Sequence, residues 1–358
     1  MKSYVLFVLP YPAHYAPSQR FRVEAYFELL RENEIAFDTH CFFDDQGWRI
    51  LYKGGSSFRK IAAVVKGFVK RTWKLVFGVQ KYDCIFIHRE AAPVGPPVFE
   101  WLLAKVHRKK IIYDFDDAIW IPNVTESNRL ARSVKCFWKV SKICQWSHTV
   151  SAGNQFLKTW AEQFSDTVVL NPTCVDTENK YNRCQQPGAD RPVIGWTGSH
   201  STLKYLDVIY PVLQRLEEEF DFDFLVICNE APTFKLASLR FIPWQESTEI
   251  EDLLNIDIGI MPLVADAWSA GKCGFKIIQY LALCIPAVAS PVGVNKEIIE
   301  PGTNGFLCGS DDEWYRALKM LLEDKNLQIQ FGRAGRQKIE TQYSVRANTN
   351  VFLSLFKN

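Results

Sequence analysis

The stretch 268–290 brings together residue types that bind phosphate groups. It reads WSAGKCGFKIIQYLALCIPAVAS, a loop of small residues that runs into a helical pattern with Gly274 and Lys276 at its start. The N-terminus of a helix offers backbone N–H groups and the positive end of the helix dipole, and both favour an anion. Lys272 would add charge there, and Gln279 is placed to hydrogen-bond a ribose or sugar hydroxyl. The stretch predicts a phosphate or diphosphate site; an ordinary core helix with solvated lysines is the alternative.

Three carboxylates follow one apolar run. The segment 111–120 reads IIYDFDDAIW and carries Asp114, Asp116 and Asp117. A carboxylate can accept a hydrogen bond from a substrate hydroxyl or stabilise positive charge that develops at a reacting carbon. We therefore take Asp116 and Asp117, with Lys276, as catalytic candidates. The alternative is that one carboxylate caps the next segment and another pairs with a basic neighbour.

The loop after the first apolar run carries a further candidate pair. It reads PYPAHYAPSQRFR over 10–22, and we expect Arg20 and His14 to contact a phosphate or an acceptor. Arg22 is as well explained by a structural role. His88 and His200 also lie near the ends of apolar runs, but a single histidine is more often a bystander than a catalyst.

A basic, aromatic helix is predicted over 57–77. At 100° per residue its basic residues fall in an arc of about 140°, with apolar residues opposite. Such a face suits anionic lipid headgroups, and 129–142 adds a second basic and aromatic segment. The alternative is an ordinary domain helix whose apolar face lies on a sheet. We expect no nucleic-acid partner, because no recognisable reading module accompanies the charge. The predicted basic residues of the first helix are Arg59, Lys60, Lys66, Lys70, Arg71 and Lys74.

Strand and helix patterns alternate along the whole chain. Near-continuous apolar strands between amphipathic helices predict parallel sheets covered on both faces, an α/β fold. The predicted strands are 4–9, 84–88, 110–114, 147–150, 167–171, 192–196, 223–228, 239–242, 256–261 and 286–290. The predicted helices include 20–33, 57–77, 95–107, 128–145, 203–219 and 274–284.

The polar segment 176–191 predicts a linker between two domains, 1–175 and 192–343. We expect two Rossmann-like, doubly wound domains that face a cleft, with ligands beyond the carboxyl ends of the strands. No predicted strand is followed by Gly-x-Gly-x-x-Gly, which removes the main support for a nicotinamide or flavin dehydrogenase.

Composition sets the outer limits of the interpretation. The 358 residues are 47% hydrophobic and 23% charged, which is typical of a globular chain. The formal net charge is only +2, but residues 51–150 hold 18 Lys and Arg against 7 Asp and Glu. This asymmetry suggests that one domain faces something anionic.

The ten cysteines are scattered, with no Cys-x-x-Cys, which suggests reduced, buried thiols in a cytosolic protein. We therefore expect neither a disulfide framework nor a metal site. The N-terminal apolar run lacks a cleavage site and is interpreted as a strand, and no stretch is long enough to span a membrane.

Several blocks in the right order resemble the GT-B glycosyltransferases, in particular the retaining family 4. The stretch 268–290 is one of these blocks, and PVGVNKEII and GTNGFL follow it. The second domain opens with IGWTGS over 194–199. The segment FIPW over 241–244 resembles the nucleotide-base loop of that family. The turn VLNPTCVD over 169–176 and the strand end that carries Asp116 also match.

The resemblance implies a set of donor-binding residues and a final helix over 344–358 that crosses back to the first domain. The family usually carries Glu-x7-Glu, whereas the equivalent positions here are Gly271 and Gln279. Its Arg and Lys pair after the first strand of the second domain is also missing, and we expect Lys272 and Lys276 to replace that charge. The implied donor-binding residues are Thr197, Gly198, Ser199, Trp244, Lys272, Gly274, Phe275 and Gln279.

The resemblance implies transfer of a sugar from a nucleotide-sugar donor to a saccharide or polyprenyl-linked acceptor, by a retaining mechanism and without a metal or other cofactor. Surface polysaccharide or glycolipid assembly is the expected setting, with a cytoplasmic protein in peripheral contact with the inner face of the membrane. The alternatives are a non-catalytic nucleotide-sugar-binding subunit, a nucleotide-sugar 2-epimerase on the same fold, and an interaction protein on this scaffold.

Overall fold

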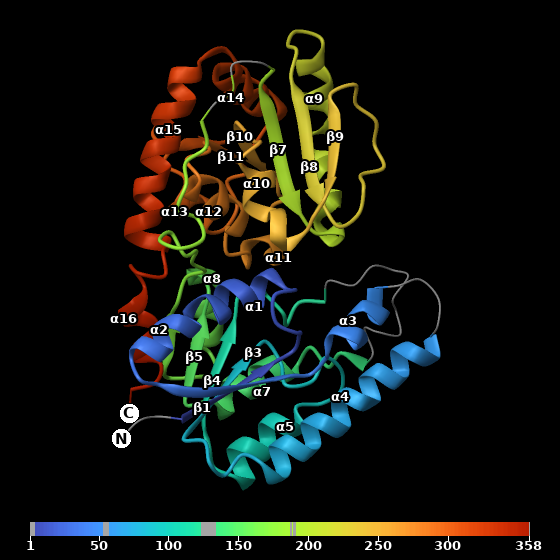
Figure 1. Ribbon diagram of the computed structural model, residues 1–358, viewed down its shortest axis with the longest axis vertical. Helices are drawn as coiled ribbons and strands as arrows, with labels where there is room; N and C mark the ends of the chain where they lie inside the picture. Colours follow the sequence, from blue (N-terminus) through green and yellow to red (C-terminus); the bar gives the residue numbers. More distant parts are fainter. Residues whose placement is uncertain (1–3, 53–56, 123–133, 187, 189–190, 358) are drawn as a thin grey trace. The chain divides into compact units, whose positions relative to one another are not determined.

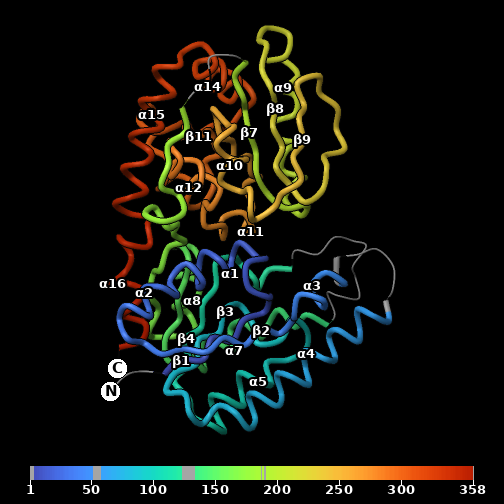
Figure 2. Tube along the Cα trace, in the orientation of Figure 1, coloured from blue at the N-terminus to red at the C-terminus, as the bar shows by residue number. Residues whose placement is uncertain are grey.

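The computed structural model describes residues 4–52, 57–122, 134–186, 188 and 191–357 (Figures 1 and 2). The chain divides into two compact units. Unit 1 comprises Met1–Pro172 with Thr349–Asn358, and unit 2 comprises Thr173–Asn348. The sequence places the corresponding divisions at 175 and 344.

Unit 1 is built on a six-stranded parallel sheet in the order β2-β1-β3-β4-β5-β6. Its inner strands are runs of apolar residues that are buried along their length, as a sheet covered on both faces requires. Because β1 lies between β2 and β3, the chain changes direction across the sheet at β1 and β3. The strands are β1 (Tyr4–Leu9), β2 (Ala36–Cys41), β3 (Cys84–His88), β4 (Lys110–Phe115), β5 (Thr149–Ala152) and β6 (Val168–Leu170).

Helices connect these strands. The longest is a 21-residue helix that begins and ends at the predicted residues 57 and 77. The helices described in unit 1 include α1 (Pro17–Arg22), η1 (Glu24–Tyr26), α2 (Phe27–Glu32), α3 (Asp45–Tyr52), α4 (Ser57–Phe77), α5 (Val98–Trp101), η2 (Leu102–Val106), α7 (Lys139–Trp146), α8 (Gln155–Ala161) and α16 (Thr349–Ser354).

Unit 2 repeats the architecture, with a six-stranded parallel sheet in the order β12-β11-β10-β7-β8-β9. Its hydrophobic core contains apolar residues of the inner strands, Trp196 among them, together with Trp314. Here the chain changes direction between β7 and β10. The strands are β7 (Val193–Gly198), β8 (Asp223–Cys228), β9 (Leu239–Pro243), β10 (Ile258–Met261), β11 (Ala287–Ala289) and β12 (Gly305–Leu307).

The helices of unit 2 begin at recognisable caps. Ser310 and Glu313 form a capping box at the start of α14, and Asp324 caps the helix that follows. The described helices are η4 (His200–Val208), α9 (Tyr210–Glu217), η5 (Glu246–Thr248), α10 (Glu249–Leu253), α11 (Ala267–Ala270), α12 (Phe275–Ala282), α13 (Asn295–Ile298), α14 (Asp311–Glu323), α15 (Lys325–Lys338) and η6 (Ile339–Tyr343).

The two parallel sheets with helical connections confirm the predicted α/β fold class. Each of the ten predicted strands corresponds to a strand of the structure, with ends that shift by up to two residues. The structure adds two strands at sheet edges, β2 and β12, that the sequence analysis did not identify.

The segment expected to be a linker falls within unit 2, and its described residues 176–186 pack against that unit. Tyr181 is fully buried, the amide of Gln185 donates to the carbonyl of Leu283, and Cys184 forms a disulfide with Cys284. The expectation that every cysteine is reduced is therefore wrong for this pair, which is 100 residues apart in the sequence.

The last helix, α16, packs within unit 1. Phe352 stacks on Tyr26 at a ring-centroid distance of 3.9 Å, and Phe356 lies against Phe7 and Phe86 of the sheet. The described helices include none that is long and apolar enough to span a bilayer.

Candidate functional site

In unit 2 the candidate residues lie near β7 and β10, the neighbouring strands between which the chain changes direction across the sheet. Between β7 and β10, the side chain of Tyr280 from α12 bridges the two strands: its hydroxyl accepts from the amide of Thr197 (3.0 Å) and donates to the carbonyl of Ile260 (3.4 Å). Gly259 permits this approach, since a Cβ there would lie 2.4 Å from the Tyr280 ring. In open parallel sheets this is the edge at which ligands bind.

The loop before α12 is held in an unusual backbone conformation. Asp266 caps α11 through the amide of Ser269 (2.6 Å), and the chain then enters α12 at Gly274, which has φ +65°. A Cβ at Gly274 would lie 2.3 Å from Ile298 Cδ1. Glycine is thus required at the start of α12 for both its backbone angle and its lack of a side chain. Phe275 is the first residue of the helix and is half-buried.

Both predicted lysines lie beside aromatic rings at this edge. Lys276 Nζ is 5.4 Å from the ring centroid of Trp196 in β7, and Lys272 Nζ is 6.0 Å from that of Tyr205 in η4. Tyr205 also accepts a hydrogen bond from Ser269 (3.3 Å), which joins η4 to the α11–α12 loop. The structure therefore brings the two lysines to the elements that carry Thr197 and Ser199.

The loop that follows β7 is closely packed. A Cβ at Gly198 would lie 2.4 Å from the Trp196 ring, and Ser199 forms a capping box with Thr202 at the start of η4. Trp244 follows β9, donates its amide to the carbonyl of Cys228 (2.9 Å), and directs its indole N–H to Glu249 (3.3 Å).

Gln279 has a different environment from the other candidates. Its side chain is 3% exposed, and its amide nitrogen donates to the hydroxyl of the buried Tyr181 (2.7 Å). The side chain thus ties α12 to the segment that leads into β7. A ribose contact from Gln279 stays a prediction.

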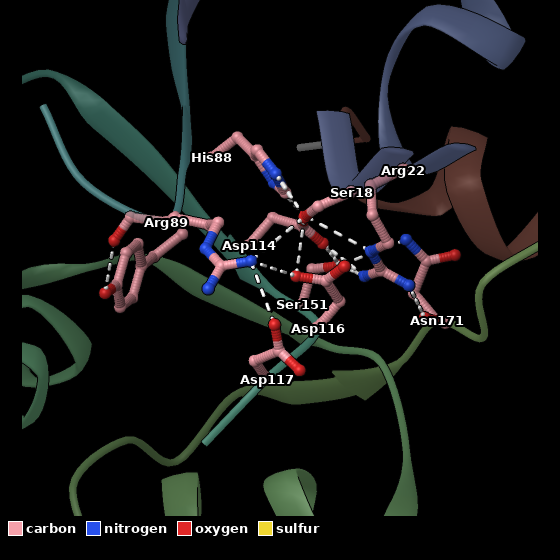
Figure 3. Close-up of polar contacts among 10 residues, drawn as sticks. Ser18, Arg22, His88, Arg89, Asp114, Asp116, Asp117, Ser151 and Asn171 are labelled. Atoms are coloured by element: carbon pink, nitrogen blue, oxygen red, sulfur yellow. Dashed lines mark hydrogen bonds and ion pairs between the residues drawn. The ribbon is translucent and has the colours of Figure 1, made fainter. Parts of the chain in front are cut away.

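Unit 1 holds a buried polar network at the carboxyl ends of β3, β4 and β5 (Figure 3). Asp114, at 0% exposure, forms an ion pair with the buried Arg22, accepts from Ser151 Oγ (2.6 Å), and contacts His88 Nδ1 (2.8 Å). Arg22 also donates to the carbonyl of Asn171. Burial alone would raise the pKa of Asp114, but Arg22 and His88 outweigh it and lower the pKa to about 2.

The network continues towards the surface through Ser18. His88 Nε2 lies 2.8 Å from Ser18 Oγ, which in turn lies 2.7 Å from Asp116 Oδ1. Arg89 donates to Asp116 (3.3 Å) and to Asp117 (3.0 Å), as the dashed lines in Figure 3 show. Asp116 and Asp117 are therefore brought together by one guanidinium, and both side chains are partly exposed.

These contacts link a buried carboxylate to a partly exposed one. Asp114 is ionised at neutral pH, so the hydrogen between it and His88 lies on Nδ1. Ser18 Oγ lies within hydrogen-bond distance of both His88 Nε2 and Asp116, so it connects the imidazole to the outer carboxylate. A histidine held in this way is a candidate general acid or base.

The backbone of Arg89 is strained. Its φ is +61°, a value that non-glycine residues rarely adopt. Two hydrogen bonds hold it there: the Arg89 amide donates to the carbonyl of Asp114 (2.7 Å), and the Tyr113 hydroxyl donates to the carbonyl of Arg89 (2.7 Å). The surrounding strands thus fix the guanidinium against the two carboxylates.

The two predicted residues of the N-terminal loop differ in exposure. His14 is exposed, and its amide donates to Glu24 (3.0 Å). Arg20 is buried, with its guanidinium 4.9 Å from the ring centroid of Phe21. Contact of either residue with an acceptor stays a prediction.

The sequence analysis missed Ser18 and Arg89 and regarded His88 as a bystander. A usable signal was present: Arg89 directly follows β3, and Asp116 directly follows β4. The carboxyl ends of neighbouring parallel strands meet at one edge of the sheet, so these residues had to lie near each other.

No group of three or more His, Cys, Asp or Glu side chains in the described ranges is arranged to hold a metal ion. The prediction that catalysis needs no metal remains a prediction.

Residues 191–324, within unit 2, match the family described as "Glycosyl transferases group 1". The chain has no match among curated proteins.

Solved structures of the same fold cover nearly the whole chain. Sucrose-phosphate synthase from Thermosynechococcus elongatus aligns with a TM-score of 0.71 and 12% identity, over 99% of this chain and 98% of that one. HepE from Anabaena, in complex with UDP and glucose, aligns at 0.65 and 15% over 100% of both chains. The lipopolysaccharide outer core galactosyltransferase WaaB, in its apo form, aligns at 0.61 and 12% over 99% of both. The predicted GT-B fold is confirmed, and residues 191–324 match a glycosyltransferase family.

Proposed function

We propose that this chain, whose residues 191–324 form a glycosyltransferase group 1 domain, moves a sugar from a nucleotide-sugar donor to a saccharide acceptor. The observation that carries the proposal is the edge of unit 2 where β7 and β10 diverge. There the start of α12, Lys272 and Lys276 converge on Trp196 and Tyr205.

Unit 2 supplies the groups that a leaving nucleoside diphosphate needs. Negative charge on the diphosphate grows as the bond to the sugar breaks, and fixed positive groups stabilise it without reorganisation. Lys272, Lys276 and the dipole of α12 are such groups, and Gly274 lets the phosphate approach the backbone closely. The loops of Thr197–Ser199 and Trp244 would hold the nucleotide. Gly271 stands where the family pattern has a carboxylate.

Unit 1 would supply carboxylates that accept hydrogen bonds and a group that holds a proton. Asp116 and Asp117 would accept hydrogen bonds from sugar hydroxyls, and the Asp114–His88–Ser18 contacts would hold a proton next to them. We further propose that transfer retains the anomeric configuration, with the departing diphosphate helping to deprotonate the acceptor, and that no metal is required.

The acceptor is proposed to be a saccharide or a polyprenyl-linked saccharide in surface polysaccharide or glycolipid assembly, at the inner face of the cytoplasmic membrane. In support, WaaB is named a galactosyltransferase of the lipopolysaccharide outer core, and HepE was solved with UDP and glucose.

The test starts with donor binding. Purified protein is heated with UDP, GDP, ADP, CMP and their common sugar conjugates, with and without EDTA. One nucleotide-sugar is expected to raise the melting temperature in both conditions, because a ligand that binds only the folded state stabilises it. Stabilisation that disappears in EDTA would contradict the metal-free site.

The lysines are then tested with a matched control. Lys272→Gln and Lys276→Gln should each weaken donor binding by about tenfold or more, since each removes a charge-assisted contact to phosphate. Lys235→Gln, at an exposed position between β8 and β9, should leave binding unchanged. Unchanged binding in both lysine variants would overturn the donor site. Donor binding without transfer to any acceptor would favour a non-catalytic subunit, and conversion of the donor sugar alone would favour an epimerase.

A further inference from the structure

Helix α4 carries a line of large apolar side chains that unit 1 does not cover. Trp73 is 72% exposed and Phe77 is 67% exposed. The members of the line recur every three or four residues, so they lie along one side of a helix about 30 Å long. They are Phe58, Ile61, Val65, Val69, Trp73 and Phe77.

Packing on the opposite side of α4 fixes this orientation. A Cβ at Gly67 would lie 2.4 Å from the ring of Phe42, so the helix backbone contacts that ring closely. Arg71 is buried, and its guanidinium donates to the carbonyls of His40 (3.0 Å) and Leu9 (2.6 Å). The sequence analysis counted Arg71 in the basic face, which is wrong. It also placed all the apolar residues on one side, whereas the structure divides them between the buried and the exposed sides.

The remaining charge of α4 is all positive. The helix contains no Asp or Glu, and Lys66, Lys70 and Lys74 recur at four-residue intervals beside the apolar line. Lys66 forms an ion pair with Asp44 (2.7 Å), and Lys74 donates to the hydroxyl of Tyr82 (2.7 Å). A groove on this surface is lined by His40, Lys66, Val69, Lys70, Trp73 and Lys74.

The groove is electropositive. Burial lowers the pKa of His40 to about 3, and Arg71, Lys70 and Lys74 contribute to the shift. His40 is therefore neutral at physiological pH, and the ammonium groups dominate the field in the groove. An anionic group would be favoured there.

Neighbouring helices extend the apolar surface. Phe68 of α4 contacts Phe99 of α5 with ring centroids 6.0 Å apart, and the two helices lie side by side in Figure 1. Along α5 and η2, Val98, Trp101 and Val106 are exposed as well.

The second predicted basic segment contributes less than expected. Residues 129–133 lie outside the described ranges, and Lys139 is buried in an ion pair with Glu90 (2.7 Å). Trp138, just before α7, is exposed.

We propose that the exposed side of α4 docks on the surface of an anionic lipid bilayer. The apolar line would enter the boundary between headgroups and acyl chains, and Lys66, Lys70 and Lys74 would contact lipid phosphates. A long apolar line with aromatic residues and an adjoining row of lysines without acidic partners on the helix matches this surface in both polarity and charge. The inference concerns unit 1 alone and does not depend on donor binding by unit 2.

The experiment measures co-sedimentation of the full chain with vesicles. Binding is expected to vesicles of phosphatidylcholine mixed with phosphatidylglycerol, and to be much weaker with phosphatidylcholine alone. The double variant Trp73→Ser, Phe77→Ser should reduce the partition coefficient by at least about tenfold, because two exposed aromatic rings no longer enter the bilayer. Lys66→Gln and Lys70→Gln should each reduce it about fivefold, and only at low ionic strength.

Matched controls come from unit 2. Met320 and Ile329 are exposed apolar residues of α14 and α15, and Met320→Ser, Ile329→Ser should bind vesicles as the unaltered chain does. Equal loss in this control, or full binding by the Trp73 and Phe77 variant, would overturn the proposal. So would a dimer in sedimentation velocity that the Trp73 and Phe77 variant abolishes, since the face would then bind a second copy. Nucleotide-sugar binding measured on the same samples separates failure here from failure of the transferase proposal.

Discussion

Asp114 and Asp116 are two residues apart in the sequence but have different roles in unit 1. Asp114 is fully buried and satisfied by Arg22, His88 and Ser151, so it serves mainly to position its neighbours. Asp116 lies further out, beyond His88 and Ser18, where it contacts Ser18 and Arg89 and is partly exposed. A substrate can therefore reach Asp116 while Asp114 fixes the imidazole behind it.

At this scale we expect Asp116→Asn to lower the rate of transfer by about 10²-fold. The amide keeps the shape of the side chain but loses the negative charge that Ser18 and Arg89 face. Initial rates with saturating donor measure the effect, and donor binding to unit 2 should not change. Asp166→Asn, at an exposed position of the same unit, is the control. Full activity in Asp116→Asn would exclude Asp116 from the chemistry.

Individual residues could be predicted where the signal is local. Gly274 and Lys276 stand in one continuous loop and helix, so their sequence already places them together. Ser18 lies in α1, whereas His88 ends β3 and Arg89 directly follows it, and their meeting depends on the strand order β1-β3-β4, which no local pattern contains. The Cys184–Cys284 pair was missed because its members are 100 residues apart in the sequence.

Among the elements, the start of α12 depends on its glycine. Gly274→Ala should lower the free energy of unfolding by about 2–3 kcal/mol, because it adds a collision with Ile298 to an unfavourable φ. Gly302→Ala is the matched control: Gly302 has φ +78° with nothing within 4 Å of an added Cβ, so about 1 kcal/mol is expected. Urea unfolding measures both variants, and equal losses would show that the contact with Ile298 is easily relieved.

The packing of α4 on β2 makes stability depend on pH. His40 has a pKa of about 3 in the folded chain and about 6.5 when unfolded. Between these values the unfolded chain binds a proton that the folded chain does not, so stability falls as the pH falls from about 6.5 towards 3. His40→Gln should flatten this dependence by up to about 1.4 kcal/mol per pH unit.

Urea unfolding at a series of pH values measures that slope. An unaltered slope in His40→Gln would mean that another group accounts for the acid sensitivity.

The elements that the sequence analysis missed are edge strands. β2 reads AFDTHC and is partly exposed along its length, so it lacks the apolar run that marks β1 or β8. β12 has only three residues, GFL, and is recognisable only by its pairing with β11. The edge strands β6 (VVL) and β9 (LRFIP) were predicted from their own apolar residues, so β2 and β12 were missed because of their sequences and not because of their place at an edge.

At the scale of the whole molecule, the C-terminal segment Thr349–Asn358 returns to unit 1 and stabilises it. Phe352 is fully buried between Tyr26 and Phe86. Phe352→Ala should destabilise unit 1 by about 3–5 kcal/mol, the usual result of removing a buried phenyl group. Hydrogen exchange measured by mass spectrometry should show faster exchange in unit 1 with unit 2 unchanged. Phe58→Ala, at an exposed phenylalanine, is the control, and faster exchange in both units would show that they unfold together.

The return of α16 also has a consequence for biosynthesis. The ribosome makes residues 4–172 first, yet part of the aromatic packing on Phe7, Tyr26 and Phe86 comes from 349–356, which are made after all of unit 2. Unit 2 is continuous in the sequence and can complete its core as soon as it emerges. Unit 1 lacks the contacts of Phe352 and Phe356 until the final helix emerges, so the unit that is translated first is the one that finishes folding last.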